Sequence, residues 1–422
     1  MRTIETKPIG AHVTIQVPGS KSYTHRTLIA AALSDGLCRV LQPLRSQDTL
    51  LTLAALEQMG IDIDNPTDQG PMVVHGNHGR FEPVSGPIDF QNSGTSMRLF
   101  GALAVLGDGP YTLTGTQRMC ERPMQALLDS LTQLGVRARS QSGNGCPPVT
   151  ITGGRCKGGR TTIDCGVSSQ YLSALLLIAP CMENGLTVEV TRGPVSKPYI
   201  DMTIDIMNAF GIDLHRDGHT RFEVPGGQTY RAGQYRVEPD GSNAGYFWAA
   251  AAIAGKRVKV EGLTAASRQG DVGLAQVLGQ MGCCVHYDPD GIAVTGGDLK
   301  AVDVEMGHMP DVVPTLAVVA AFAQGTTIIR NVAHLRAKEC DRLAAVSREL
   351  GKMGIQTRVH ENELEIVGGE PKGAVIETYD DHRIAMSFAV AGVKVPGVKI
   401  IDPGCVAKSF PNYWEVFERL YH

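Results

Sequence analysis

The sequence contains no long apolar run. Its longest alanine-rich stretch, Ala249–Ala254, is far shorter than the roughly 20 residues that cross a bilayer, and its first residues do not resemble a secretory signal peptide. The chain also carries no excess of positive charge: 39 lysines and arginines stand against 43 aspartates and glutamates, a net charge of −4. We therefore expect a cytoplasmic globular protein that binds neither membranes nor nucleic acid.

Cysteine pairs with metal-binding spacing are also absent. The chain has ten cysteines, but none of them forms a C-x-x-C motif. In a cytoplasmic protein such thiols stay reduced, so we expect neither disulfides nor a structural metal site.

One pattern that is present, in Val17–Leu33, is a turn followed by an apolar helix. Pro18 and Gly19 form the turn, and the hydroxyl of Ser20 or Ser22 can cap the helix. The small apolar residues at its C-terminal end leave no polar face, so this helix is predicted to be buried.

The basic residues of this helix need another explanation. Lys21 and Arg26 lie in its first turns, where acidic side chains are the favoured partners of the helix dipole. Free N–H groups at a helix N-terminus already attract anions. Two cations at this place therefore favour a phosphate or carboxylate site.

A turn, a cap and an alanine-rich helix recur five more times, at a spacing of roughly 70–75 residues. Short β-like runs lie between these helices. A second helix follows in each copy, usually before a glycine that can end it. Each copy is therefore predicted to form a βαβαββ unit. The further copies begin at Asn92, Gly166, Pro239, Met309 and Tyr379, and the second helices are expected at 48–60, 123–135, 199–211, 271–282, 341–354 and 411–420.

Six such units predict an α/β protein with two similar domains of three repeats each. One domain is expected to hold residues 19–236. The other is expected to combine residues 1–18 with 237–422, so that short crossings near Val17 and Val237 join the two. The helices would lie buried and parallel, as in a barrel turned inside out. Their N-termini would then converge on a cleft between the domains.

Charged and hydroxyl residues recur at five of the six helix starts. Each has an ordinary explanation on its own: exposed cations are usually solvated, Asp341 and Asp381 can be N-caps, and His382 can be a core histidine. The fourth repeat offers Ser242 and Asn243 and little charge, so we expect it to be architectural. The recurrence in the other repeats favours a cationic site for anions.

The motifs at these helix starts resemble those of the 5-enolpyruvylshikimate-3-phosphate (EPSP) synthase family. They span nearly the whole chain in the family's order, and together they are highly specific. The motifs are Pro18-Gly-Ser-Lys-Ser-x-x-x-Arg26, Asn92-Ser-Gly-Thr-x-Met-Arg98, Arg122-Pro, Ser168-Ser-Gln170, Arg336-Ala-Lys-Glu-Cys-Asp-Arg342, Asp381-His-Arg383 and Ala407-Lys408.

The resemblance implies a transferase of the shikimate pathway, which leads to chorismate and the aromatic amino acids, and a target of glyphosate. Its reaction would move the enolpyruvyl group of phosphoenolpyruvate to the 5-hydroxyl of shikimate 3-phosphate through a tetrahedral ketal and release phosphate. The resemblance also implies two closing domains, no metal or organic cofactor, and these two small molecules as partners. We expect a monomer.

The resemblance further assigns roles to single residues. Asp311 would take the hydroxyl proton, Glu339 would exchange a proton with the enol carbon, and Lys21 would assist the departing phosphate. Shikimate 3-phosphate would be held by Lys21, Ser22, Arg26, Ser168, Ser169, Gln170, Ser196, Tyr199, Asp311, His334 and Lys338. Phosphoenolpyruvate would be held by Lys21, Gly94, Arg122, Gln170, Arg342, Arg383 and Lys408.

Three residues depart from the pattern of some family members. His334 stands in place of asparagine, Leu99 stands in place of proline, and Cys340 lies inside the fifth motif, where we expect it to pack rather than react. The nearest alternative is the sister enzyme that acts on UDP-N-acetylglucosamine. Its reactive cysteine would fall at Gln117, and Cys120 does not match that position. A non-catalytic repeat scaffold would leave the recurring acids and cations unexplained.

Overall fold

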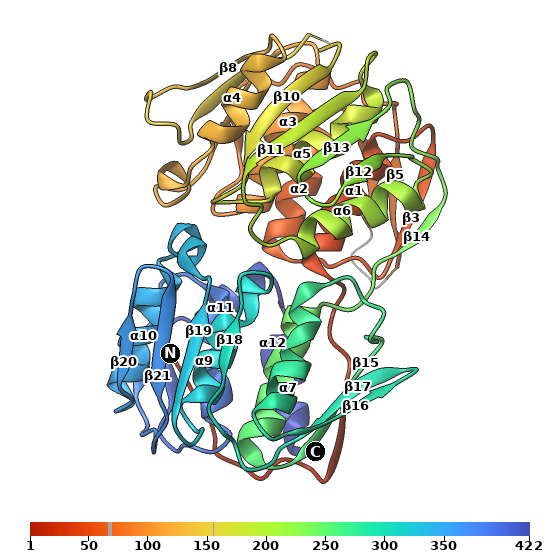
Figure 1. Ribbon diagram of the computed structural model, residues 1–422. Coiled ribbons are helices and arrows are strands. Elements are labelled where there is room, and N and C mark those ends of the chain that lie inside the picture. The colour runs from red at the N-terminus through yellow and green to blue at the C-terminus, as the bar shows by residue number, and fades with distance from the viewer. Residues whose placement is uncertain (66–69, 155) are drawn as a thin grey trace. The chain divides into compact units, whose positions relative to one another are not determined.

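The computed structural model describes residues 1–65, 70–154 and 156–422, and Figure 1 shows its elements in chain order. It contains two compact units. We call Gly19–Val237 the central unit, and Met1–Pro18 together with Glu238–His422 the terminal unit. Each unit has its own hydrophobic core, and each is described here by itself.

The central unit contains three four-stranded sheets, in the orders β14-β3-β5-β4, β6-β7-β9-β8 and β10-β11-β13-β12. In each sheet the first two strands pair in parallel and the remaining neighbours are antiparallel. The strands are β3 (Leu37–Leu41), β4 (Asp62–Asp64), β5 (Met72–His75), β6 (Ile88–Asp89), β7 (Pro110–Thr114), β8 (Arg137–Ser140), β9 (Val149–Thr152), β10 (Gly159–Asp164), β11 (Leu186–Arg192), β12 (His215–Asp217), β13 (Arg221–Val224) and β14 (Gln234–Arg236).

The described residues of this unit form six α-helices beside these sheets. The first helix of each repeat is buried almost along its whole length, because its sequence offers no polar face. Among these inner helices, α3 packs on α5. The second helix of each repeat, by contrast, keeps exposed positions. The helices are α1 (Lys21–Ala32), α2 (Gln47–Gln58), α3 (Gly94–Leu103), α4 (Gln125–Gln133), α5 (Gln170–Ile178) and α6 (Pro198–Ala209), with 3₁₀ turns η1 (Ala104–Leu106), η2 (Met119–Glu121) and η3 (Ala179–Cys181).

The terminal unit repeats this plan with two four-stranded sheets, β16-β17-β15-β2 and β18-β19-β21-β20, and one three-stranded sheet, β1-β23-β22. Its strands are β1 (Arg2–Thr3), β2 (His12–Ile15), β15 (Arg257–Glu261), β16 (Cys284–Asp288), β17 (Gly291–Thr295), β18 (Asp303–Glu305), β19 (Thr326–Arg330), β20 (Thr357–Val359), β21 (Glu363–Val367), β22 (Val375–Ile376) and β23 (Lys399–Ile400).

The inner helices α7, α9 and α11 of this unit pack on one another. In α7 the run from Gly241 to Ile253 is buried throughout, and Gly255 ends the helix in the left-handed conformation at φ 66°. The helices are α7 (Gly241–Ala254), α8 (Leu274–Gln280), α9 (Val313–Ala320), α10 (Arg342–Lys352), α11 (His382–Ala391) and α12 (Tyr413–Glu418), with 3₁₀ turns η4 (Gly270–Gly273), η5 (Pro310–Val312), η6 (Ala333–Ala337), η7 (Pro403–Lys408) and η8 (Arg419–Tyr421).

The predicted α/β class with repeated units is confirmed, and two details differ. The first strand of repeat one is β14, which comes from the end of the central unit and pairs with β3. The prediction of a βαβαββ unit is wrong for repeat six, where α12 leads into η8. There β1, from the N-terminal segment, pairs antiparallel with β23 and supplies that sheet's third strand.

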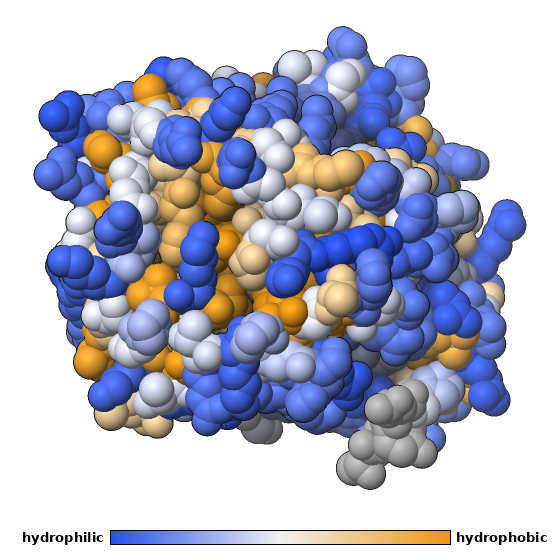
Figure 2. All heavy atoms as spheres, turned by 90° about the horizontal axis from the view of Figure 1, so that it is seen from below, coloured by the Kyte–Doolittle hydropathy of each residue, from blue (hydrophilic) through white to orange (hydrophobic). Residues whose placement is uncertain are grey.

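Apolar side chains gather in patches on the surface (Figure 2). Figure 2 shows hydrophobic side chains gathered on one face, with hydrophilic side chains around them. Among the helices of the described residues, none combines the length and apolar character needed to traverse a bilayer.

Candidate active site

Lys21 forms a buried ion pair at the first helix start of the central unit. Ser20 caps α1, its hydroxyl accepting from the Tyr23 N–H at 3.4 Å, and Lys21 is the first helical residue. The Lys21 Nζ donates to Asp48 Oδ2 at 3.0 Å, and both side chains are buried. Asp48 lies in the first turn of α2, so the pair joins two helix starts. We did not single out Asp48 from the sequence, because an acid at a helix start is ordinary.

Two arginines meet at the start of α3. Arg122 Nη1 donates to the Asn92 carbonyl oxygen at 3.3 Å and to Asn92 Oδ1 at 3.4 Å, while Arg98 Nη1 donates to the Gly94 carbonyl oxygen at 3.1 Å. A Cβ built on Gly94 would collide with Arg122 Nη2 and lie 2.6 Å from Arg98 Nη1. Glycine therefore lets both guanidinium groups approach this helix start, where anions are favoured.

Arg26 is completely enclosed by protein. Its Nε donates to Thr203 Oγ1 at 2.8 Å, its Nη1 to the Ser22 carbonyl oxygen at 2.9 Å, and its Nη2 to Ser173 Oγ at 3.3 Å and the Tyr199 carbonyl oxygen at 3.1 Å. Burial lowers the pKa of Arg26 to about 10. In the structure this guanidinium ties α1 to α5 and α6, and its contact with substrate stays a prediction.

Several of the residues expected to hold shikimate 3-phosphate lie at or contact the start of α5. Ser168 Oγ accepts from the Gln170 N–H at 3.2 Å, and Ser169 Oγ donates to the Ser196 carbonyl oxygen at 3.4 Å. Gln170 Nε2 donates to Thr95 Oγ1 at 3.0 Å and so links α5 to α3. Ser168, Ser169, Gln170 and Ser196, all predicted for this substrate, are thus brought together within this unit.

In the terminal unit, Arg342 gathers three carboxylates. It is the first residue of α10 and is 1% exposed. Its Nη1 donates to Asp311 Oδ1 at 2.9 Å, its Nη2 to Glu339 Oε2 at 2.9 Å, and its Nε to Asp381 Oδ2 at 2.8 Å. Burial opposes the charge, but the carboxylates of Asp381, Glu339 and Asp311 outweigh it and raise the pKa of Arg342 well above its usual value.

Arg383 holds the other oxygen of Asp311. Its Nη2 donates to Asp311 Oδ2 at 3.1 Å, and its Nη1 to the Tyr246 hydroxyl at 3.1 Å and to Asn243 Oδ1 at 3.5 Å. Burial raises the pKa of Tyr246 to about 12, so this phenol stays neutral. Asp311 therefore lies between two guanidinium groups, and both favour its negative charge.

Repeat four, which we expected to be architectural, supplies partners for Arg383. Asn243 and Tyr246 of α7 both accept from Arg383, and Ser242 Oγ donates to Asp271 Oδ2 at 2.5 Å. These contacts could not be predicted from the sequence, because Ser242, Asn243 and Tyr246 are uncharged and lie in an otherwise apolar helix. Asp271, the partner of Ser242, is acidic but lies outside this helix, in η4.

Several residues near the site have the ordinary structural roles that their positions predict. Asp341 caps α10 by accepting from the Ala344 N–H at 3.1 Å. Asp381 caps α11 by accepting from the Arg383 N–H at 2.9 Å, and it also binds Arg342. His382 is fully buried. An acid can therefore serve as a cap and as a partner of the site at once.

His334 is a buried, neutral imidazole. Burial, with Lys338 as the next cause, lowers the pKa of His334 to about 3. Its Nε2 has no hydrogen-bond partner within the described parts of the chain. It lies in η6, directly before the run that carries Lys338 and Glu339. Glu339 and, in η7, Lys408 are also buried.

Cys340 lies against the same carboxylates. Its Sγ donates to Asp381 Oδ2 at 3.5 Å, and burial raises the pKa of this thiol. A protonated thiol is a poor nucleophile, which agrees with a packing role.

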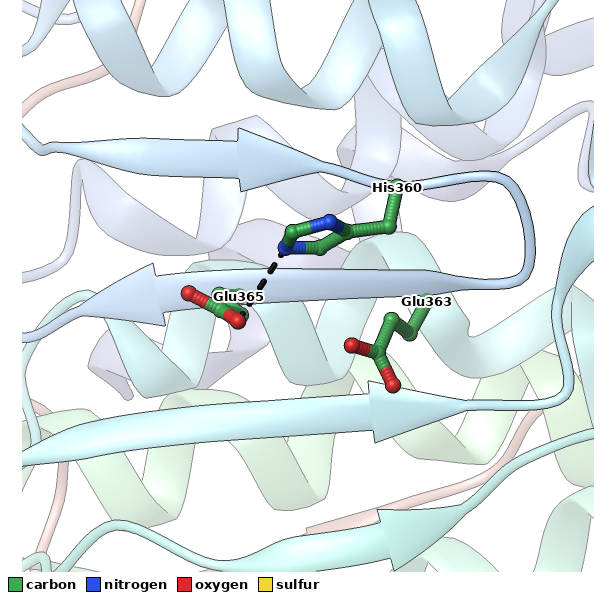
Figure 3. Close-up of side chains that lie close together, drawn as sticks. All are labelled: His360, Glu363 and Glu365. Atoms are coloured by element: carbon green, nitrogen blue, oxygen red, sulfur yellow. Dashed lines mark hydrogen bonds and ion pairs between the residues drawn. The ribbon is translucent and has the colours of Figure 1, made fainter.

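One cluster outside the site has potential metal ligands. Figure 3 shows His360, Glu363 and Glu365 beside the hairpin of β20 and β21, with their ligand atoms within 4.8 Å of one another. His360 Nε2 lies 3.1 Å from Glu365 Oε1, while Arg330 binds Glu363 and Arg358 lies 3.9 Å from Glu365. Both carboxylates already face cations, so we interpret the cluster as cross-strand ion pairs.

Repeated α/β units with cations and carboxylates gathered at their helix starts are typical of a protein that binds small anions. The sequence profile of EPSP synthase (3-phosphoshikimate 1-carboxyvinyltransferase) matches residues 6–417. A 3-phosphoshikimate 1-carboxyvinyltransferase of Syntrophobacter fumaroxidans is 45% identical over 99% of both chains, and one of Methanoculleus marisnigri is 43% identical over 98% of both. An EPSP synthase structure from Acinetobacter baumannii superimposes with a TM-score of 0.83 at 29% identity, over 99% of this chain and 97% of that one. The chain belongs to the EPSP synthase family.

Proposed function

We propose that the enzyme transfers the enolpyruvyl group of phosphoenolpyruvate to the 5-hydroxyl of shikimate 3-phosphate and releases phosphate. The observation that carries this proposal is the shared carboxylate of Asp311, held by Arg342 and Arg383 with Glu339 on the same arginine. An acid–base pair set among cations is what an addition–elimination between anionic substrates requires.

Phosphoenolpyruvate carries one carboxylate and one phosphate, and the arginines are suited to both groups. Guanidinium groups bind carboxylate and phosphate through paired N–H donors. We propose that Arg122, Arg342 and Arg383 hold its carboxylate and phosphate together with Lys21 and Lys408. The approach of Arg122 to Gly94 and the burial of Arg342 and Arg383 support these roles.

Shikimate 3-phosphate needs hydroxyl donors for its phosphate and polar groups for its ring. The cluster of Ser168, Ser169 and Ser196 supports the first role, because these residues already contact one another or the same helix start. For the ring we propose Gln170, Tyr199 and Lys338, with His334 as a neutral hydrogen-bonding group. Ser22 and Arg26 would complete the set from α1.

The proposed chemistry has two steps. In the addition, Asp311 takes the proton of the 5-hydroxyl while the hydroxyl oxygen bonds to C2 of phosphoenolpyruvate. Glu339 gives a proton to C3. In the elimination, C3 returns a proton to Glu339 while the C2–O bond to phosphate breaks, and the proton that Asp311 took leaves with the phosphate, so both carboxylates regain their starting state. Lys21 stabilises the departing phosphate. The lysine and arginine side chains stabilise the negative charges of the substrates during the reaction, so we propose a reaction without metal or organic cofactor. One chain supplies all of these residues, and a monomer suffices.

Phosphate release tests the proposal directly. With both substrates present, phosphate should accumulate in step with one enolpyruvyl product, and omission of either substrate should abolish it. The same assay with UDP-N-acetylglucosamine as acceptor tests the sister activity. Turnover with that acceptor, and none with shikimate 3-phosphate, would overturn the proposal. The absence of a cysteine at Gln117 supports the expected outcome.

A further inference from the structure

Asp271 is a buried carboxyl that the proposed chemistry does not use. It lies in η4 and is 5% exposed. Ser242 Oγ donates to its Oδ2 at 2.5 Å. Two neighbours hold the same first turn of α7: Asp240 accepts from the Asn243 N–H at 2.9 Å, and Gln269 accepts from the Gly241 N–H at 3.0 Å. Asp271 is therefore part of the anchor of this helix start.

The anchored turn contacts the candidate site. Asn243 follows Ser242 directly, and Tyr246 lies one turn further along α7. Both accept from Nη1 of Arg383, whose Nη2 binds Asp311. A short path of hydrogen bonds and helix backbone thus connects Asp271 with Arg383.

Charged groups from at least three elements act on Asp271. They include Asp240 at the N-cap of α7, Asp311 in η5 and Arg383 in α11. The helix α8, which also packs against η4, carries no ionisable side chain. Burial, and next the charge of Asp311, raise the pKa of Asp271 to about 7, while the hydrogen bond from Ser242 and the charge of Arg383 oppose this rise.

We propose that Asp271 is a positioning residue for Arg383: with Ser242 it fixes the first turn of α7, and the charge on its carboxyl sets how strongly Arg383 attracts the anionic substrate. An ionised Asp271 adds a negative charge that acts on the Arg383 guanidinium and weakens anion binding. A neutral Asp271 removes that charge and strengthens binding. The inference rests on the proposed function in one respect, because it takes Arg383 as a ligand of phosphoenolpyruvate.

The direction of the pH effect follows from linkage. The native carboxyl has its pKa above the ordinary value of 3.8, so the native state binds more protons than the unfolded state between about pH 4 and pH 7. The protein therefore loses stability as pH rises through this window. The variant Asp271→Asn should lack this loss. Thermal unfolding of both proteins without substrate, from pH 4.5 to pH 8, measures the difference. A difference in melting temperature that stays constant with pH would overturn the titration.

The second measurement is the KM for phosphoenolpyruvate between pH 6 and pH 8. The ratio of the KM values of two proteins cancels the titration of the substrate itself. Relative to Asp271→Asn, the parent KM should rise with pH by a few-fold to about tenfold, since one pKa unit of coupling is tenfold in affinity. Ser242→Ala removes a hydrogen bond that favours the ionised carboxyl of Asp271. The KM of this variant should therefore begin to rise at a higher pH than the KM of the parent protein.

Controls separate this role from a merely structural one. Asp290→Asn removes one negative charge from an exposed residue of the same unit and should follow the parent protein. A KM ratio for Asp271→Asn that does not change with pH would reduce Asp271 to a structural anchor and overturn the proposal. If Asp271→Asn does not fold, Ser242→Ala still decides, because an unshifted profile contradicts the inference. An absence of turnover in every protein would instead count against the proposed function.

Discussion

Lys21 and Asp48 form a buried ion pair between the first turns of two helices, with Nζ 3.0 Å from Oδ2. The pair joins α1 and α2 at the point where both helices begin. Lys21, which we propose contacts the departing phosphate, is therefore held in place by a carboxylate of the protein, that of Asp48. Such a partner fixes the direction of the flexible lysine side chain.

Replacement of Asp48 by asparagine should both destabilise the protein and slow turnover. Loss of one partner from a buried pair leaves the other charge poorly compensated, a cost of about 3 kcal/mol. Urea unfolding should show this loss, and kcat should fall because Lys21 is less well oriented. The double variant Lys21→Met/Asp48→Asn should regain much of the stability but no activity.

A surface pair provides the control for this experiment. Lys157 and Glu183 lie 3.4 Å apart in the same unit, and both side chains are largely exposed. Glu183→Gln should leave the unfolding curve almost unchanged, because exposed pairs contribute little. Equal effects of Asp48→Asn and Glu183→Gln would contradict the structural role of the buried pair.

The sequence predicted those parts of the fold that depend on local patterns. The apolar helix around Trp248 was recognisable because it has no polar face. The pairing of β14 with β3 was not, because it joins residues about 195 positions apart through strands of three to five residues and leaves no periodic signal. Long-range pairing of short strands depends on tertiary packing rather than on local propensity.

The residues of the candidate site likewise fall into two groups, those that the sequence pattern indicated and those that only their contacts reveal. Lys21 stood out because cations are unfavourable at helix N-termini without an anion, and Arg342 was assigned from the family resemblance. Asp48 and Asp271 did not stand out, since acids at such positions are normal caps. Tyr246 was hidden in an apolar helix, where an aromatic residue usually indicates core packing. Residues with an ordinary structural explanation can be assigned to a site only from their contacts.

The acid–base pair gives a sharp prediction. Asp311→Asn and Glu339→Gln should each fold and bind substrate but lose kcat by roughly a hundredfold or more, the usual scale for general acid–base groups. Asp341→Asn is the matched control, because Asp341 caps α10 and asparagine caps a helix equally well. Single-turnover measurements with all three variants test the assignment. Near-normal turnover in either of the first two would remove that residue from the chemistry.

His334 should make the protein sensitive to acid but not to mild alkali. Its pKa of about 3 lies below the ordinary 6.5, so the unfolded state binds more protons between these values and stability falls as pH drops through this window. The loss approaches about 1.4 kcal/mol for each pH unit. His334→Asn should remove it and keep activity within a few-fold, because the amide can still form hydrogen bonds.

Unfolding curves at pH 4.5, 5.5 and 7 measure this effect. The control is His360→Asn, a change at an exposed histidine of the same unit, which should leave the acid sensitivity in place. Parallel stability profiles for the parent protein and His334→Asn would mean that the pKa of His334 is the same in the native and unfolded states.

The last prediction concerns Gly94 and inhibition by glyphosate, which the family resemblance suggests as a competitor of phosphoenolpyruvate. A Cβ at Gly94 would press against the guanidinium groups of Arg122 and Arg98. These are ends of flexible side chains, so Gly94→Ala should fold and stay active with the arginines displaced. The KM for phosphoenolpyruvate should then rise by a few-fold. Glyphosate is longer and should reach nearer to this helix start, so its inhibition constant should rise more.

Steady-state inhibition with varied phosphoenolpyruvate, for the parent protein and the variant, gives both constants from one data set. Gly351→Ala is the control, because an added Cβ at this helical glycine meets nothing within 4 Å; it should leave both constants unchanged. Inhibition in the parent protein should be competitive. If Gly94→Ala raised the KM and the inhibition constant by the same factor, the displaced arginines alone would explain the effect, and the longer inhibitor would not reach Gly94.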